Sequence, residues 1–263
     1  MSATIVRDMP EKTAGAEVSL KVPWGFASIL AVIVFAFLFL VKWYQHKYSW
    51  SVGLDAWSPE FETYWMTVLY AQMTILPTVG VVGSAYLWFS RDRNIQQLPA
   101  REELRRYYTT FGILAVLSFV LIATLGLLTE ADASWHQVVI RDTDFTPTHI
   151  FLFYLGIPGG FVGLSMSWIW IHTRLPYFAN RVSIPLSLAF LGFLMAGPVV
   201  AFNEWGHTFF YAEELFSSPV HWFFVVAAGN LVFLTGFVVQ CLQRMRELTG
   251  KMSLTELDKA MKV

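Results

Sequence analysis

The chain has a single cysteine and few charged residues. Only 14% of its 263 residues are Asp, Glu, Lys or Arg, against about 25% in an average soluble domain. One cysteine, Cys241, excludes an intramolecular disulfide and thiolate metal sites, and its position in an apolar run predicts a buried, inert thiol. A net charge of −1 offers none of the basic surface that nucleic-acid binding requires, so no nucleic-acid partner is expected.

The apolar residues, 56% of the chain, are gathered into long runs. Crossing a bilayer as a helix takes about 20 apolar residues, and six runs without Asp, Glu, Lys or Arg approach or exceed that length. The six runs are 23–41, 63–90, 111–129, 150–171, 182–203 and 219–242. The sequence therefore predicts an all-α, polytopic integral membrane protein with about six transmembrane helices plus short interfacial helices.

The polar segments at the two termini are predicted to lie outside the membrane-spanning region. Residues 1–22 are mixed in charge and predict a cytoplasmic N-terminal arm, 23–243 form the transmembrane bundle, and 244–263 form a cytoplasmic C-terminal tail. Ser58, Pro59 and Glu60 are typical of a helix start, so a short helix is expected on the outer surface before the second span. Pro77 predicts a kink in that span.

The basic residues lie almost entirely on one side of these spans. If the N-terminus is cytoplasmic, fifteen of the eighteen Lys and Arg fall in cytoplasmic segments, and only Lys42, Lys47 and Arg141 fall outside. The positive-inside rule therefore predicts a multi-pass protein with both termini in the cytoplasm.

Two similar trios of polar residues lie in the loops on the outer side. Asp132 precedes His136 by four positions, and His149 follows thirteen positions later. Asn203 likewise precedes His207 by four positions, and His221 follows after fourteen. Two imidazoles and one oxygen suit a first-row transition metal that keeps open positions. All six residues fall at one membrane edge, which favours two metal sites there. His46 and His172 belong to neither trio and are interpreted as interfacial.

Two other kinds of metal site match parts of this pattern. Residues 204–207 read Glu-x-x-His, an element of di-iron carboxylate proteins, but that architecture needs two such pairs, and no other histidine here has Glu three residues before it. Haem needs axial histidines that face each other across a bundle. His149 with His221, or His136 with His207, would satisfy that, so a haem- or quinone-binding subunit of an electron-transfer complex stays open as the alternative.

Several segments resemble one known family, the C subunit of the copper membrane monooxygenases, which includes the particulate methane, ammonia and short-chain hydrocarbon enzymes. The resemblance is carried by SWHQVVIRDTDFTPTH at 134–149 and NEWGHTFFYAEELFSSPVHW at 203–222, supported by GLDAWSPEFETYWM at 53–66, SRDRN at 90–94 and TRLPYFA at 173–179. All six residues of the two trios match. Leu152 stands where methane and ammonia members usually carry an acid, so the sequence leaves the substrate open among methane, a short alkane and ammonia.

The resemblance implies a subunit of a copper-dependent monooxygenase that hydroxylates a small substrate with O₂ and takes electrons from a quinol. It implies a metal on Asp132, His136 and His149, with zinc able to replace copper there. It also implies copper on Asn203, His207 and His221, which are the expected catalytic residues. Two further subunits, of A and B type, are the expected partners in a trimer of heterotrimers, together with membrane lipid. The expected location is a bacterial inner or intracytoplasmic membrane.

Overall fold

The structure is a computed structural model that describes residues 24–135, 138–141, 143, 145–194 and 222–250. Within these ranges the chain is helical and contains no strand; the only β-type pairing is an isolated bridge between Asp55 and Arg141. The predicted all-α membrane fold is confirmed. Three helical segments in the described part are long and apolar enough to cross a bilayer: Trp24–Tyr48, Pro59–Phe89 and Pro147–Arg174.

Six longer helices and several short elements make up the bundle. The longer helices are α1 (Trp24–Tyr48), α3 (Thr67–Phe89), α4 (Ala100–Trp135), α6 (Ile157–Arg174), α8 (Ile184–Leu194) and α11 (Trp222–Thr249). The short α-helices are α2 (Pro59–Phe61), α5 (Pro147–Phe151) and α7 (Pro176–Ala179). The others are the π-helical segments η1 (Glu62–Met66) and η3 (Leu152–Gly156) and the 3₁₀ turn η2 (Ile95–Gln97). Helix α11 continues past residue 243, into the segment predicted as the C-terminal tail.

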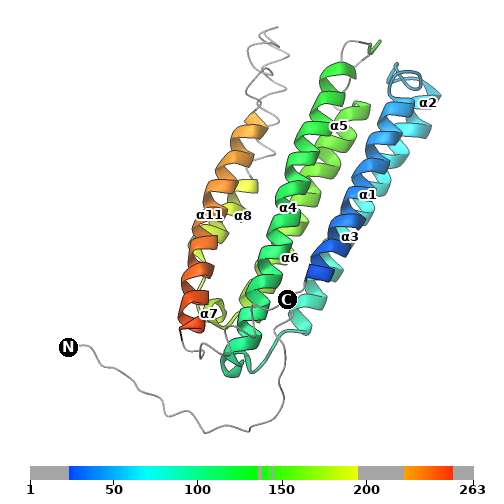
Figure 1. Ribbon diagram of the computed structural model, residues 1–263. Coiled ribbons are helices and arrows are strands. Elements are labelled where there is room, and N and C mark those ends of the chain that lie inside the picture. The colour runs from blue at the N-terminus through cyan, green and yellow to red at the C-terminus, as the bar shows by residue number, and fades with distance from the viewer. Residues whose placement is uncertain (1–23, 136–137, 142, 144, 195–221, 251–263) are drawn as a thin grey trace.

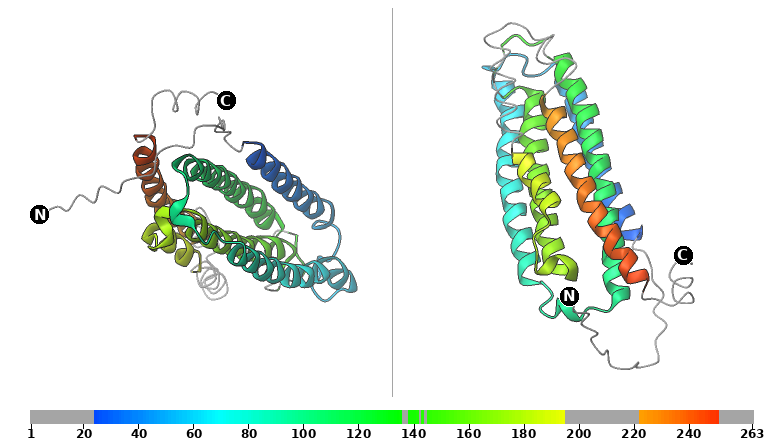
Figure 2. Two further views of the ribbon diagram at one scale, coloured as in Figure 1. Left: turned by 90° about the horizontal axis from the view of Figure 1, so that it is seen from below. Right: turned by 90° about the vertical axis from the view of Figure 1, so that its left-hand side faces the viewer.

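The long helices form two rows (Figures 1 and 2). In one row α1 packs on α4, and α4 packs on α11. In the other row α3 packs on α6, and α6 packs on α8. The two rows are joined at one edge, where α8 packs on α11. We call the end of the bundle where α4 ends and α5 begins the trio end, because Asp132 and His149 belong to those helices. The opposite end, where α3 and α6 finish, is called the basic end.

Small residues set the distance between paired helices. A Cβ added to Gly80 of α3 would lie 3.1 Å from the side chain of Val162 on α6, and one added to Gly83 would lie 2.7 Å from Met166. Gly236 on α11 meets Pro185 on α8 in the same way, at 3.0 Å. Larger side chains would force these helices apart, as expected for membrane helices that pack through small residues.

Two buried clusters stabilise the bundle, one near each end. The cluster at the trio end joins α1, the continuous segment α2–η1–α3, α4, α5 and η3, and it consists of Val41, Phe61, Trp65, Leu69, Leu128, Ile150, Phe151 and Leu152. The cluster at the basic end joins α4, α6, α7, α8 and α11 and consists of Leu104, Tyr107, Ile171, Leu175, Phe178, Leu186, Phe237, Cys241 and Leu248. Cys241 is fully buried and free, as the sequence predicted.

The entry to the second span differs in form from the expectation. Ser58 does cap a helix start, and its hydroxyl accepts a hydrogen bond from the Phe61 N–H at 3.2 Å. That helix does not lie apart on the surface, because α2 runs through η1 directly into α3. The α-helix continues through Pro77. The irregular turn in the span that begins at His149 is η3, which ends just before Pro158, a residue whose ring crowds the carbonyl four positions earlier in a regular helix.

Candidate metal centre

His149 lies in the first turn of α5, in the most completely buried stretch of the described chain. Seven consecutive residues, 146–152, are buried. Thr146 caps the helix, and its Oγ1 accepts a hydrogen bond from the His149 N–H at 3.0 Å. Pro147 occupies the position after the cap, where its missing N–H costs nothing. The cap, the proline and the surrounding core together fix the backbone that carries the imidazole.

The His149 ring also packs on an aromatic side chain. Its centroid lies 4.5 Å from that of Phe153, with 35° between the ring planes. Phe153 belongs to η3, the π-helical segment that begins three residues after His149. π-Helical turns inside α-helices occur frequently at functional sites. Here the wider turn places an aromatic ring against the candidate ligand.

Asp132 is part of the last turn of α4, which packs against α5. It follows Leu128 by four residues and precedes Trp135 by three, and both of those side chains are buried at the trio end. The α-helix continues to Trp135, so Asp132 sits on a regular helical backbone rather than in a loop. The structure thus brings together the helix ends that carry Asp132 and His149.

The loop between α4 and α5 is fastened to the loop that follows α1. The Ile140 N–H donates to the Leu54 carbonyl at 2.9 Å. Arg141 donates to the Asp55 carboxylate at 2.6 Å, and its guanidinium lies 4.4 Å from the centroid of the Trp57 ring. We call these contacts the loop clasp. The clasp holds the segment that links the second and third members of the first trio.

Hydrogen bonds stabilise the ionised form of the Asp55 side chain. The Trp57 N–H donates to the carboxylate at 3.0 Å. This backbone hydrogen bond, with that from Arg141, lowers the pKa of Asp55 below its ordinary value. The carboxylate is therefore fully ionised near neutral pH, so its attraction for Arg141 is at full strength there.

Two buried polar side chains near the trio end have no hydrogen-bond partner among the described residues. They are the Gln45 carboxamide, at both of its polar atoms, and the Ser49 hydroxyl, although Gln45 is only 1% exposed and Ser49 only 2%. Gln45 lies on the face of α1 that also buries Leu38 and Val41, and α1 packs on α4. Ser49 directly follows the end of α1, and its N–H donates to the Gln45 carbonyl at 2.8 Å. An unsatisfied buried polar atom costs about 1–3 kcal/mol.

The position of these polar side chains along the axis of the bundle follows from the register of α1 against α4. Gly112 of α4 lies against Ala27 of α1, with 3.1 Å between an added Cβ and the alanine methyl, and both helices run toward the trio end (Figure 1). The same number of residues then leads from Ala27 to Gln45 and from Gly112 to Glu130. Since each helical residue rises by about 1.5 Å, Asp132 stands level with the turn of α1 between Gln45 and Ser49.

Helix α5 lies at the same position along the axis of the bundle as this turn. It contacts both α1 and α4, and the ring of Phe151 lies 6.1 Å from that of Tyr44, centroid to centroid. The residues fit a bound cation: an imidazole, the backbone position of a carboxylate, and buried amide and hydroxyl groups with unused hydrogen-bonding capacity. Sequence reasoning identified the first two and missed Gln45 and Ser49. Their signal was the continuation of the buried face of α1, at four-residue spacing, past the end of the apolar run.

The remaining predicted ligands lie outside the described residues: His136, Asn203, His207 and His221. Helix α11 begins at Trp222, directly after His221. No group of three His, Cys, Asp or Glu side chains is brought together within the described ranges. His46 is exposed at the end of α1, and His172 lies at the basic end with its Nδ1 2.7 Å from the Trp168 carbonyl oxygen. His172 therefore lies at the opposite end of the bundle from His149, and the interpretation of both residues as interfacial stays a prediction.

The sequence matches one known family over most of its length. Residues 11–252 match the family described as the C subunit of ammonia monooxygenase/methane monooxygenase. The chain belongs to this family. Comparison with curated proteins finds no match. Membership identifies the chain as a subunit of a multi-subunit membrane monooxygenase, and it confirms the resemblance seen in residues 134–149 and 203–222.

Proposed function

We propose that this chain carries two metal sites of a copper-dependent monooxygenase at the trio end of the bundle. The first site uses Asp132, His136 and His149. The second uses Asn203, His207 and His221, and is the catalytic one. The complex would oxidise methane, a short alkane or ammonia, with A- and B-type subunits as partners in a trimer of heterotrimers.

The buried setting of His149 supports this proposal most directly. Polar and ionisable groups inside a membrane protein are costly and mark functional positions. Here an imidazole lies in a stretch of seven buried residues, level with the Asp132 turn of α4 and with Gln45 and Ser49, two polar side chains that have no hydrogen-bond partner among the described residues. A purely structural core would fill this volume with apolar side chains at lower cost.

The proposed reaction is a balanced oxygen insertion. A substrate R–H, O₂ and a quinol give R–OH, water and the quinone: one oxygen atom enters the substrate bond, and the other leaves as water with the two quinol hydrogens. Copper, when bound, supplies the activation of O₂. The protein supplies ligands on fixed backbone, through the Thr146 cap at His149 and the regular last turn of α4. The apolar wall around His149 excludes water from the site.

The assignment of catalysis to the second trio rests on ligand chemistry. Asn203 is a neutral and weak ligand, so a copper ion there is less electron-rich and keeps a replaceable position for O₂. Asp132 adds charge to the first site, which favours tight retention of a cation. The first site would therefore be structural or relay electrons.

Metal analysis of the purified complex tests the ligand sets. Asp132→Ala should lose more metal than Asn203→Ala, because removal of a carboxylate removes Coulombic attraction as well as a bond. Glu60→Ala, at an exposed acid of the neighbouring helix α2, is the control and should keep the wild-type metal content. Equal retention of metal in both ligand variants would contradict the assignment.

Measurement of turnover then tests which of the two sites is catalytic. His207→Ala should abolish oxidation in a complex that still assembles, measured on one preparation by size-exclusion chromatography and product formation. Near-normal turnover in the intact complex would rule out the second trio as the catalytic site. A dithionite-reduced spectrum of the same preparation should lack a Soret band from this subunit; such a band would favour the haem alternative.

A further inference from the structure

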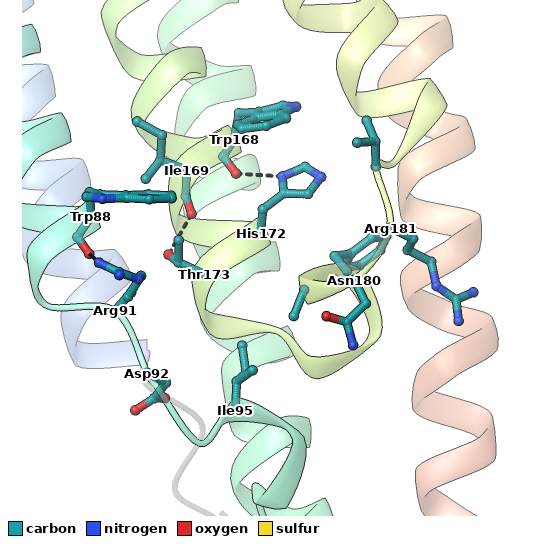
Figure 3. A pocket seen from close by; sticks show the side chains of 13 residues that line it. Trp88, Arg91, Asp92, Ile95, Trp168, Ile169, His172, Thr173, Asn180 and Arg181 are labelled. Carbon is teal, nitrogen blue, oxygen red and sulfur yellow. Dashed lines mark hydrogen bonds between the residues drawn. The ribbon is translucent and has the colours of Figure 1, made fainter.

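A cavity of about 560 Å³ opens at the basic end, where α3 and α6 finish and the chain turns toward α8. Trp88, Arg91 and Asp92 line one side of it (Figure 3). His172 and Thr173 of α6 lie in the middle, and Asn180 and Arg181 lie on the far side. Neither the trios nor the proposed reaction uses these residues.

The cavity is separated from the candidate metal centre by the thickness of a membrane. His149 begins the span and His172 ends it, 23 residues later. At about 1.5 Å per residue this separation is roughly 35 Å, and a bilayer core is about 30 Å thick. A reductant bound in the cavity would thus be a full membrane thickness from the first trio. The cavity lies at the level of lipid headgroups on the opposite surface.

The charge around the cavity favours an anion. The guanidinium of Arg91 lies 4.6 Å from the ring centroid of Trp88 and donates to the Trp88 carbonyl at 2.9 Å. Arg181 lies 4.3 Å from the Tyr177 ring centroid. Neither arginine forms an ion pair with any residue in the described part of the chain. Aromatic stacking orients a guanidinium and leaves its N–H groups for a ligand.

The one acid of the cavity does not neutralise these arginines. Asp92 pairs instead with Arg106 of α4 at 2.5 Å. Arg174, at the end of α6, donates to uncharged oxygens, the Leu87 carbonyl at 3.1 Å and the Ser90 hydroxyl at 2.7 Å. The local balance is therefore positive.

The apolar part of the lining extends toward the lipid-facing surface. Trp168 and Ile169 of α6 continue the lining upward from His172 (Figure 3). Val182 and Ile184, at the start of α8, are 61% and 69% exposed. A ligand that joins an anionic head to apolar chains matches this arrangement, whereas a soluble anion would leave the aromatic and aliphatic wall unused.

We propose that this cavity binds the headgroup of an anionic phospholipid, with the phosphate held between Arg91 and Asn180 and with Arg181 adding positive charge at the rim. The acyl chains leave along α6 and the start of α8. Basic pockets between transmembrane helices are known to hold anionic headgroups. The site also contacts the ends of α3 and α6 and the turn before α8, so an occupying lipid would link these elements.

The test uses the intact complex, washed in detergent and then given nanodiscs of phosphatidylglycerol or of phosphatidylcholine. Lipid retained after re-purification is counted by native mass spectrometry. The wild type should retain phosphatidylglycerol and not phosphatidylcholine. Each arginine contributes about fivefold to affinity at a membrane surface, so Arg91→Gln and Arg181→Gln should each lower retention about fivefold. Arg91→Lys should restore part of it.

Arg93→Gln is the matched control, because Arg93 is an exposed residue of the same loop and does not line the cavity. Equal loss in this variant would show a general surface-charge effect and overturn the proposal. So would equal retention of phosphatidylcholine, a copurified quinone in place of the lipid, or displacement of the lipid by millimolar inorganic phosphate. If Arg91→Gln fails to assemble, Arg181→Gln decides alone, since its exposed side chain makes no hydrogen bond to a described residue.

Discussion

Arg141 donates to the Asp55 carboxylate across 2.6 Å, and this contact joins the two loops that flank the candidate metal centre. Asp55 follows α1, and Arg141 stands between the second and third members of the first trio. Beside it the Ile140 N–H donates to the Leu54 carbonyl. A side-chain pair and a backbone hydrogen bond thus hold one short stretch of the ligand-bearing loop in register with α1.

Asp55→Asn should loosen this clasp. The substitution keeps the hydrogen bond from the Trp57 N–H, because the side-chain amide oxygen of asparagine can still accept it. The attraction for the Arg141 guanidinium is lost, so the loops should open more often. Faster hydrogen exchange at the Ile140 amide in the assembled complex is the expected result. Glu60→Gln, a change of the same kind at an exposed acid of the adjoining helix α2, should leave that exchange rate unchanged. An unaltered Ile140 rate in Asp55→Asn would show that the salt bridge does not hold the loop.

The clasp should also depend on pH in a defined direction. The Trp57 N–H and Arg141 lower the pKa of Asp55 in the folded protein, below the ordinary value of about 3.9. A lowered carboxyl pKa adds stability that is fully present above the unfolded pKa and is lost as the pH falls through the folded one. Protection of the Ile140 amide, corrected for intrinsic exchange, should therefore persist down to about pH 4 and decline only below it. A decline between pH 7 and 5 would contradict this and would point to a histidine.

A second ion pair should dominate stability at the basic end. Arg244 of α11 donates two hydrogen bonds to Glu103 of α4, at 2.9 and 3.0 Å, and Glu103 is only 2% exposed. Removing one partner of a buried pair costs about 3–5 kcal/mol when the remaining charge is left uncompensated. In Glu103→Gln, Arg244 keeps a second and more exposed partner, Glu247, at 2.9 Å, so the cost should lie near or below the lower end of that range and should still lower the Tm of the complex.

Two further variants make that prediction specific. Glu102→Gln weakens the more exposed pairs with Arg105 and Arg106, one turn along the same helix, and should cost about 1 kcal/mol or less. The double variant Glu103→Leu/Arg244→Met replaces both charges with apolar side chains and should recover most of the lost stability. If the double variant is less stable than Glu103→Gln, the pair has a role beyond charge compensation.

Much of the architecture was predictable because the membrane imposes it. Apolar runs of the length of a bilayer must be helical to satisfy their backbone. Each of the long described helices overlaps a predicted run, although α4 (Ala100–Trp135) extends well past both ends of the run 111–129. What the runs could not reveal is the detail at helix ends. Helix α1 continues seven residues past Val41, since apolarity ends before helical structure does. The entry at Ser58 was predicted from its cap, but continuity through η1 depends on packing of Trp65 in the trio-end core.

The candidate site was predictable only in its ligands. Asp132 and His149 are recognisable by residue type and spacing, and the structure brings their helix ends together. Gln45 and Ser49 carry only a weaker signal, the four-residue spacing that continues the buried face of α1. A glutamine near the end of an apolar run is normally interfacial, and its burial follows only from the register of α1 on α4, which the contact between Ala27 and Gly112 fixes. The basic-end cavity likewise joins residues from segments 80 positions apart.

The orientation of the bundle is predicted by its charge and can be measured with one thiol per variant. Cys241 is fully buried, so the wild-type protein should label little. Val138→Cys, in the α4–α5 loop, should react with an impermeant maleimide from the outer side, and Gln97→Cys, at the basic end, only after the membrane is opened. The positive-inside rule gives this result, since fifteen of eighteen basic residues are assigned to the inner side. Labelling of position 138 only from inside would reverse the arrangement and place the trios in the cytoplasm.

The variant Gln45→Leu tests whether this side chain supports the metal site or is only an unsatisfied amide in the core. An unpartnered buried amide costs about 1–3 kcal/mol, so if Gln45 has no partner in the working complex, leucine should raise the Tm and leave the metal unchanged. If Gln45 hydrogen-bonds the ligands of the first trio or a molecule bound there, leucine should leave the Tm unchanged or lower it, and should lower metal retention. Loss of such supporting hydrogen bonds typically reduces metal affinity about 10–100-fold. We expect this second outcome.

The matched control for that experiment is Gln72→Leu. The Gln72 side-chain oxygen is also buried without a hydrogen-bond partner among the described residues. It lies on α3, thirteen residues into the span that begins at Pro59 and therefore well away from the trio end. The same substitution there should leave the metal content and the electron paramagnetic resonance spectrum unchanged. A shifted copper spectrum in Gln45→Leu alone would place the amide beside the first metal. Equal metal loss in both variants would instead mean that the bundle as a whole had loosened, and Gln45 would then have no special place at the site.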